Sequence, residues 1–250
     1  MRKLSRTFSL VLFALFTTGV GAADFVPQVI RTHPHEASAF TQGLVFDHGL
    51  LYESTGRYGH STLSVRELKT GRLLYHRHLP KTIFGEGIAL VGDEIFQLTW
   101  KERQVFVYDR TNLRLKRTLS YAWEGWGLTY DGRHLIASDG SAQLRFLDPA
   151  TLREVRRIDV KEGDQLINQL NELEYVKGEI FANRYGSDRI ARVSPQTGQV
   201  IAWIELSLLY PQQLRSSREA VLNGIAYDAA LGELIVTGKY WPNLYVIPAP

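Results

Sequence analysis

Short apolar runs recur along this chain in pairs, and a brief polar turn separates the two runs of each pair. The first runs of the pairs begin at Leu44, Ile88, Leu128, Leu173 and Ile225. Two β-rich runs joined by a short turn that contains Gly or Asp predict a β-hairpin. A second hairpin of the same kind follows in the first four repeats, so each of these repeats supplies four strands.

The five repeats open with similar words: Q-G-L-V-F at 42–46, E-G-I-A-L at 86–90, W-G-L-T-Y at 126–130, N-E-L-E-Y at 171–175 and N-G-I-A-Y at 223–227. A repeat of roughly 40 to 50 residues is typical of propeller blades, and a blade consists of four strands. We therefore predict an all-β fold, a five-bladed β-propeller of four-stranded antiparallel blades. A β-sandwich with irregular repeats is the alternative.

The fifth repeat ends after its third strand, at 244–247, and lacks a fourth. An unpaired strand candidate, Phe25–Arg31, lies near the other end of the chain. We expect this N-terminal strand to close the last blade, because closure protects an exposed edge. The segment Leu208–Arg218 breaks the repeat, and we expect a loop or short helix there, over one face of the propeller.

The first residues have the pattern of a targeting segment. Arg2, Lys3 and Arg6 precede an apolar run at 8–15, and small residues follow at 19–23. We predict a signal peptide over 1–23, export to the periplasm or the exterior, and a single propeller domain over 24–250 without a membrane anchor. The run is short for a membrane span, and an uncleaved anchor is the alternative.

The composition narrows the chemistry. The chain has no cysteine, which excludes thiolate nucleophiles, disulfides and Cys-ligated zinc. Its net charge is +3 without a basic run, so we expect no nucleic-acid partner. Two histidine pairs, His33 with His35 and His76 with His78, suggest zinc, but neither has a third ligand at suitable spacing. We therefore expect neither a metal nor another cofactor.

Equivalent positions of a closed ring meet around its axis. The residues that open the repeats form one set: Gln42, Glu86, Trp126, Asn171 and Asn223. A second set lies five residues after the matching aliphatic residue of the second strand: Gly56, Trp100, Gly140, Tyr185 and Lys239. These two rings combine a carboxylate, an ammonium group, amides and aromatic rings, whereas a purely structural ring should repeat small or apolar residues.

A carboxylate among indoles should have a raised pKa, because burial disfavours its charged form. Such a group is suited to proton transfer near neutral pH. Each ring residue also has a structural alternative. Glu86 could form an ion pair with Lys239, the tryptophans could pack between blades, and the three amides could bond turns or backbone groups.

Several motifs resemble those of one family, the zinc-independent glutaminyl cyclases (glutaminyl-peptide cyclotransferases) of plants and bacteria. They include A-F-T-Q-G-L at 39–44, F-G-E-G-I-A-L at 84–90, E-G-W-G-L-T at 124–129, L-N-E-L-E-Y at 170–175 and V-T-G-K at 236–239. The resemblance extends from about residue 31 to 247. It implies a five-bladed propeller with its active site at one mouth of the axis.

The resemblance also implies residue roles. Glu86 would be the general acid/base, and Trp100, Trp126, Asn171 and Lys239 would lie in the substrate pocket, with Phe40, Gln42 and Phe84 nearby. Tyr185 stands where the family often has tryptophan, which affects substrate preference rather than chemistry. The expected substrates are peptides or proteins with an N-terminal glutamine.

We therefore expect a monomeric enzyme that converts N-terminal glutaminyl residues into pyroglutamate with loss of ammonia. Glu86, Asn171 and Lys239 would be catalytic, and the aromatic residues would surround the glutaminyl side chain. One alternative is a non-catalytic exported propeller that binds peptides or organises envelope complexes. Another is a calcium-dependent lactonase. That function would need a cluster of carboxylates around the axis, whereas only Glu86 is acidic among the ten ring residues.

Overall fold

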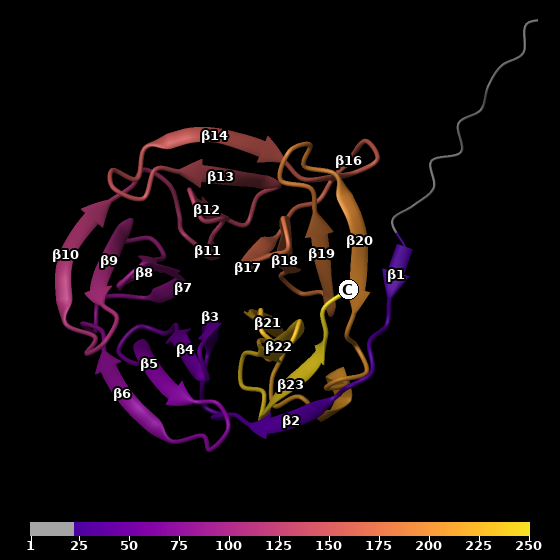
Figure 1. Ribbon diagram of the computed structural model, residues 1–250, viewed down its shortest axis with the longest axis horizontal. Helices are drawn as coiled ribbons and strands as arrows, with labels where there is room; N and C mark the ends of the chain where they lie inside the picture. Colours follow the sequence, from indigo (N-terminus) through magenta and orange to yellow (C-terminus); the bar gives the residue numbers. More distant parts are fainter. Residues whose placement is uncertain (1–22) are drawn as a thin grey trace, which may run out of the picture.

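Five sheets surround a central axis in the computed structural model, which describes residues 23–250 (Figure 1). The predicted signal peptide therefore lies almost entirely outside the described residues. The first blade consists of β3 (Thr41–Asp47), β4 (Leu50–Thr55), β5 (Thr62–Glu67) and β6 (Leu73–His78). The second consists of β7 (Gly85–Val91), β8 (Glu94–Thr99), β9 (Gln104–Asp109) and β10 (Leu115–Ser120).

The third blade consists of β11 (Leu128–Tyr130), β12 (Leu135–Ala137), β13 (Gln143–Leu147) and β14 (Glu154–Asp159). A small hairpin, β15 (Lys161–Glu162) and β16 (Gln165–Leu166), precedes the fourth. The fourth consists of β17 (Leu170–Val176), β18 (Glu179–Arg184), β19 (Arg189–Val193) and β20 (Val200–Glu205). The fifth consists of β21 (Leu222–Asp228), β22 (Glu233–Gly238), β23 (Asn243–Pro248) and β2 (Arg31–Pro34). The predicted five-bladed propeller is confirmed.

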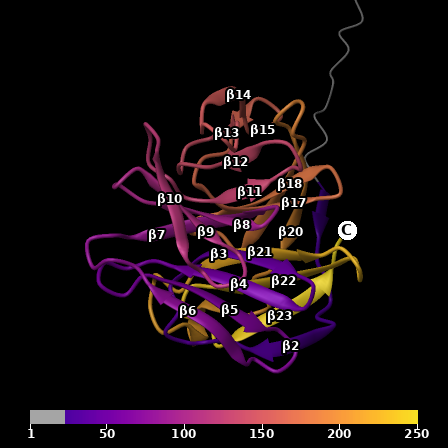
Figure 2. The same cartoon turned by 60° about the vertical axis from the view of Figure 1, so that its left-hand side comes forward.

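An N-terminal strand closes the fifth blade, as predicted, but it lies later in the chain than the predicted segment. β2 pairs antiparallel with β23, with Arg31 opposite Val246, and the two strands lie side by side in Figure 1 and Figure 2. The predicted 25–31 segment shares only Arg31 with this strand. Before it, β1 (Ala23–Phe25) pairs parallel with β20 and adds a fifth strand to the fourth blade. Pro27 lies between β1 and β2 and has no N–H for a ladder.

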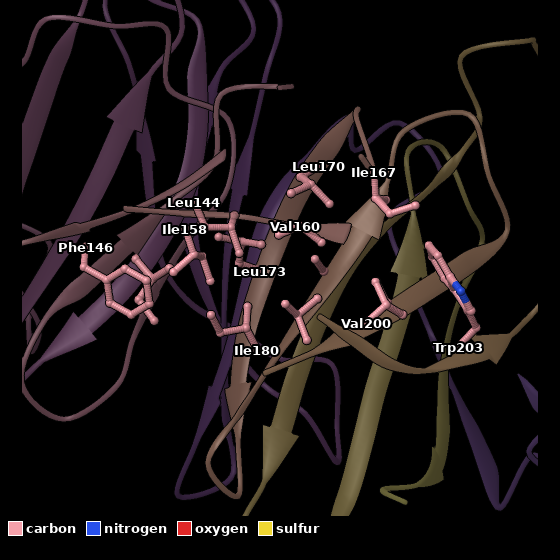
Figure 3. Packing of buried hydrophobic residues seen from close by; sticks show 14 residues of the cluster. Leu144, Phe146, Ile158, Val160, Ile167, Leu170, Leu173, Ile180, Val200 and Trp203 are labelled. Atoms are coloured by element: carbon pink, nitrogen blue, oxygen red, sulfur yellow. The ribbon is translucent and has the colours of Figure 1, made fainter. Parts of the chain in front are cut away.

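Apolar side chains fill the spaces between neighbouring blades. Figure 3 shows the cluster between the third and fourth blades, where Leu144 and Phe146 from β13 approach Ile180 from β18. The outermost strands are mostly exposed: the side chains of β6 and β10 are largely accessible, whereas those of β4 and β8 are buried. The axis is therefore enclosed by buried strands, and side chains near it are shielded from water.

Four of the five innermost strands have a register shift at the same point of the repeat. The shifts lie between Thr41 and Gly43, Gly85 and Ile88, Leu170 and Leu173, and Leu222 and Ile225. Such β-bulges redirect a side chain and are common beside active sites. The residues inside these shifts include the ring positions Gln42, Glu86, Asn171 and Asn223.

The connection between β20 and β21 is the longest between two blades. It contains one turn of 3-10 helix, η1 (Gln212–Leu214), which agrees with the loop or short helix expected for this segment. Within residues 23–250, no helix has the length and hydropathy needed to cross a membrane.

Candidate active site

One cavity of about 910 Å³ opens at the mouth of the propeller. All nine residues predicted from the sequence line it: Phe40, Gln42, Phe84, Glu86, Trp100, Trp126, Asn171, Tyr185 and Lys239. They come from all five blades or from the segments that lead into them. Eight of the ten ring positions therefore line one cavity, whereas Asn223 and Gly140 do not.

Glu86 is the most isolated charged group of this cavity. Glu86 lies within the register shift of β7, and the residue is only 3% exposed. No hydrogen bond from any of residues 23–250 reaches its carboxylate. Burial raises the pKa of Glu86 well above its ordinary value, and the Lys239 ammonium partly opposes this. The nearby carboxylates of Glu102 and Glu124 raise the pKa further.

Lys239 is held by the opposite side of the site. Its ammonium donates a hydrogen bond to the side-chain carbonyl of Gln42, and Asn223 Nδ2 lies 3.3 Å from the same oxygen. Lys239 Nζ also lies 4.2 Å from the centre of the Phe40 ring. Burial lowers the pKa of Lys239 to about 8, although the Glu86 carboxylate favours the charged form.

No ion pair joins Glu86 to Lys239 within the described part of the chain; the lysine contacts Gln42 instead. The alternative in which these two residues form a structural ion pair is therefore wrong. The two groups interact electrostatically across the cavity, so each influences the protonation of the other. A substrate can enter between an acid and a cation that are not already bonded to each other.

Aromatic rings form the cavity walls. Phe84 lies 5.4 Å from Trp100, and Trp126 lies 6.1 Å from Tyr185, measured between ring centres. Trp100 donates its indole N–H to Glu124 at 3.0 Å. The indole N–H of Trp126 is buried without an acceptor among residues 23–250. Buried polar groups normally have partners, so this N–H is available to a bound ligand.

Asn171 also has unused hydrogen-bonding capacity. Its side-chain carbonyl is buried without a partner among residues 23–250, whereas its backbone carbonyl accepts a bond from Ser138 at 2.7 Å. The backbone bond anchors the residue, and the amide remains free to contact a ligand. Asn171 and Trp126 thus supply unpaired polar atoms in a cavity that is otherwise largely aromatic.

The remaining ring positions support the site. Asn223 does not line the cavity; it donates to the backbone carbonyl of Thr41 at 2.9 Å and approaches Gln42. A Cβ at Gly140, where φ is +80°, would lie 2.8 Å from the Trp126 ring. Asn223 therefore helps to position Gln42, and the absence of a side chain at Gly140 leaves room for the Trp126 ring.

Sequence reasoning missed the outer part of the cavity. Its further lining residues are Ser38, Thr55, Arg57, Tyr58, His60, Glu219 and Tyr240. Arg57 pairs with Glu219 at 2.5 Å and donates to the Tyr240 hydroxyl at 3.0 Å. The sequence could have indicated two of these residues, because Arg57 and Tyr240 directly follow the ring positions Gly56 and Lys239.

The histidine pairs have other partners. His35 contacts the Trp241 carbonyl at 2.7 Å and the Glu53 carboxylate at 2.9 Å. The rings of His76 and His78 pack against each other. Among residues 23–250, no three or more His, Asp, Glu or Cys side chains are grouped as metal ligands.

Comparisons with known proteins show which family and which folds the chain is similar to. Residues 10–248 match the family described as glutamine cyclotransferase. A glutaminyl-peptide cyclotransferase of Arabidopsis thaliana is 41% identical over 224 residues, which cover 88% of this chain and 70% of that protein. The crystal structure of Myxococcus xanthus glutaminyl cyclase has a TM-score of 0.84 at 38% identity and covers 90% of this chain and 97% of its own. The WD40 propeller domain of Doa1, at 14% identity and a TM-score of 0.50, covers 83% of this chain and 63% of its own; it shares only the fold.

Proposed function

The chain belongs to the glutamine cyclotransferase family, and on that premise we propose that it converts N-terminal glutaminyl residues of peptides and proteins into pyroglutamate. Ammonia is the second product. The observation that carries the proposal is that Glu86 is buried, without a hydrogen-bond partner among residues 23–250, in an aromatic cavity that Lys239 and Asn171 also line. This arrangement fits a reaction that needs proton transfer and no enzyme nucleophile.

The nucleophile is the α-amine of the substrate itself. It attacks the carbon of its own side-chain amide and forms the five-membered lactam. Because the amine is already tethered to the amide, the enzyme has to hold only the reactive conformation. The walls formed by Trp100, Trp126 and Tyr185 suit this task, since they restrict an extended glutaminyl side chain.

Glu86 accepts the proton that the α-amine loses when the new C–N bond forms. It returns a proton to the departing nitrogen when the amide C–N bond breaks, and ammonia leaves. A peptide α-amine has a pKa near 8. The raised pKa of Glu86 brings the acid closer to that of the amine, and proton transfer is efficient between groups of similar pKa.

The carbonyl oxygen of the substrate amide gains negative charge during the attack. Asn171 and Lys239 are the proposed donors to this oxygen or to Glu86. The unpaired indole N–H of Trp126 is a third available donor. Donors fixed in a water-poor site stabilise developing charge more than they would in bulk water.

We also propose that residues 1–23 direct export and that the enzyme acts as a monomer in the periplasm or outside the cell. The basic start, with Arg2 and Lys3, and the short apolar run at 8–15 support export. Expression of the full chain followed by cell fractionation and N-terminal sequencing tests this. An uncleaved protein in the membrane fraction would contradict it, and sedimentation of the exported protein tests the oligomeric state.

The test of the reaction is ammonia release from Gln-Ala-NH₂, with N-acetyl-Gln-Ala-NH₂ as the matched control. The acetylated peptide has the same side-chain amide but no free amine, so only the first peptide should yield ammonia and a cyclic product. Ammonia from both peptides would indicate hydrolysis instead. Ammonia from neither would favour the non-catalytic alternative, and ester opening that stops on addition of EDTA would favour the calcium-dependent lactonase.

A further inference from the structure

A second cavity, of about 480 Å³, lies beside the first on the same mouth of the propeller. It is lined by Gly186, Gln212, Arg215, Ser217, Arg218 and Val221. Chain neighbours join the two cavities: Tyr185 and Glu219 line the first, and the adjacent Gly186 and Arg218 line the second. In addition, the Val221 carbonyl accepts a bond from the Lys239 backbone N–H at 2.9 Å. The two cavities therefore share a wall.

The long connection between β20 and β21 supplies most of this second cavity, and Arg215 fixes its shape. Arg215 pairs with Asp188 at 2.7 Å, and both side chains are largely buried. The guanidinium also lies 5.2 Å from the centre of the Trp241 ring and donates to the Tyr210 carbonyl at 2.8 Å. A loop anchored in this way presents its remaining side chains in defined positions.

Arg218 differs from the other charged groups nearby. Its side chain is exposed, and it has no hydrogen bond or ion pair with any of residues 23–250. Asp188 neutralises Arg215, and Arg57 pairs with Glu219, the acid next to Arg218 in the chain. The second cavity consequently carries one uncompensated positive charge.

A peptide whose first residue occupies the cavity of Glu86 must leave through its mouth. Each further residue of an extended chain advances at most about 3.3–3.6 Å, so the next few residues can reach a cavity that shares a wall with the first. We propose that the second cavity binds the substrate residues that follow the N-terminal glutamine, and that Arg218 favours an acidic side chain there. This inference rests on the proposed cyclisation.

The experiment uses the full-length protein and a series of tetrapeptide amides, Gln-Ala-Ala-Ala-NH₂ and its versions with Glu or Lys at position two, three or four. Gln-Ala-NH₂ is the reference, because it has no charged side chain for Arg218 to recognise. The variants are Arg218→Ala and Arg218→Glu. Arg133→Glu is the matched control. The Arg133 side chain is also exposed and has no hydrogen bond or ion pair with any of residues 23–250, but it lies in the turn between β11 and β12, at the opposite face of the propeller.

We expect the wild type to favour Glu over Lys at one of the three positions by about two- to fivefold in kcat/KM, the size of one exposed charge contact. Arg218→Ala should remove this preference and Arg218→Glu should reverse it, and added salt should weaken it. Activity on Gln-Ala-NH₂ and the behaviour of Arg133→Glu should not change.

The inference would be overturned if the wild type showed the same kcat/KM for the Glu and Lys peptides at all three positions, provided that Gln-Ala-NH₂ is still cyclised. It would also be overturned if the wild type preferred Glu and Arg218→Glu kept the same preference, because another residue would then be responsible. If no variant and no wild-type protein cyclises Gln-Ala-NH₂, the proposed function itself fails and the inference fails with it. The short peptide thus separates the two cases.

Discussion

Replacing Glu86 with glutamine separates proton transfer from packing. The amide has nearly the same shape as the carboxyl group, so the aromatic walls should keep their positions. No hydrogen bond to the carboxylate is lost, since none of residues 23–250 donates one. The substitution therefore removes the titrating proton and leaves the rest of the cavity in place.

The expected loss follows from the role of the acid. A positioned general acid or base contributes about 10²- to 10⁴-fold to a rate, which corresponds to roughly 2.7–5.4 kcal/mol of activation free energy. In the proposed mechanism Glu86 serves both the attacking amine and the leaving ammonia, which favours the upper part of this range. Stability should not fall, because the neutral amide avoids the desolvation cost of a buried carboxylate, and no hydrogen bond with residues 23–250 is lost.

The assay is the rate of ammonia release from saturating Gln-Ala-NH₂, together with the thermal unfolding midpoint of each variant. Glu174→Gln is the matched control. Glu174 is also buried, and burial raises its pKa to about 8, but it does not line the cavity and should be dispensable for turnover. A Glu86→Gln protein that melts like the wild type and loses less than about tenfold in kcat would refute the assignment of Glu86 as acid/base.

Four further outcomes follow from the structure. The pKa of Lys239 lies at about 8, so the lysine loses its charge as pH rises through that value. We therefore expect kcat/KM of the wild type to decline there. The pH profile of Lys239→Met should lack this decline. The pKa of Glu174 rises on folding, so its contribution to stability is complete below about pH 4.5 and is lost as pH increases through about 8; urea midpoints should therefore decrease less over that range in Glu174→Gln than in the wild type. Tyr185→Trp should change KM across a set of Gln-initial peptides with little effect on kcat, since it alters a wall and not the proton path; a large fall in kcat with unchanged KM would contradict this. Arg215→Ala leaves the buried Asp188 carboxylate unpaired, a loss of roughly 3–5 kcal/mol where such a pair is broken, and limited proteolysis should cut the connection between β20 and β21 faster than in the wild type.

The sequence was sufficient to predict the fold and the inner part of the site because both depend on repetition. Hairpin patterns and turn residues recur locally, and equivalent positions of a closed ring must converge. Glu86 and Lys239 come from different blades, yet their positions in the repeat were enough to place them in one cavity. Hydrophobic periodicity alone did not distinguish these residues. They were recognised because equivalent positions of the repeats carry different residue types, whereas a structural position should repeat one type.

The parts that the sequence did not predict depend on contacts between distant segments. The closing strand is Arg31–Pro34 because its backbone matches the free edge of β23, and nothing within 25–31 marks that register. Similarly, the loop of Arg215 has no periodicity, and its shape depends on Asp188 from the preceding blade. The Arg57–Glu219 pair at the rim joins the first blade to this same loop.

Glu172 illustrates the same limit inside the ring. It stands where the other four repeats have glycine, and the repeat pattern alone gives no role for it. The structure gives it a different task, because its fully buried carboxylate accepts the backbone N–H groups of Leu44 at 3.2 Å and Ile225 at 2.8 Å. Glu172 therefore joins the fourth blade to the first and fifth.

The contrast between these two buried acids explains why we propose a catalytic role for only one of them. The innermost strands of the second and fourth blades shift register where their repeats open, and neighbouring residues can then point in different directions. Glu172 is directed to backbone donors of other blades, and its hydrogen bonds fix it there. Glu86 lines the cavity and has no such bonds with any of residues 23–250, and in the proposed mechanism it exchanges a proton with a bound amine. The distinction between a structural and a reactive carboxylate thus depends on the direction that a bulge gives to the side chain, more than on burial, which the two residues share.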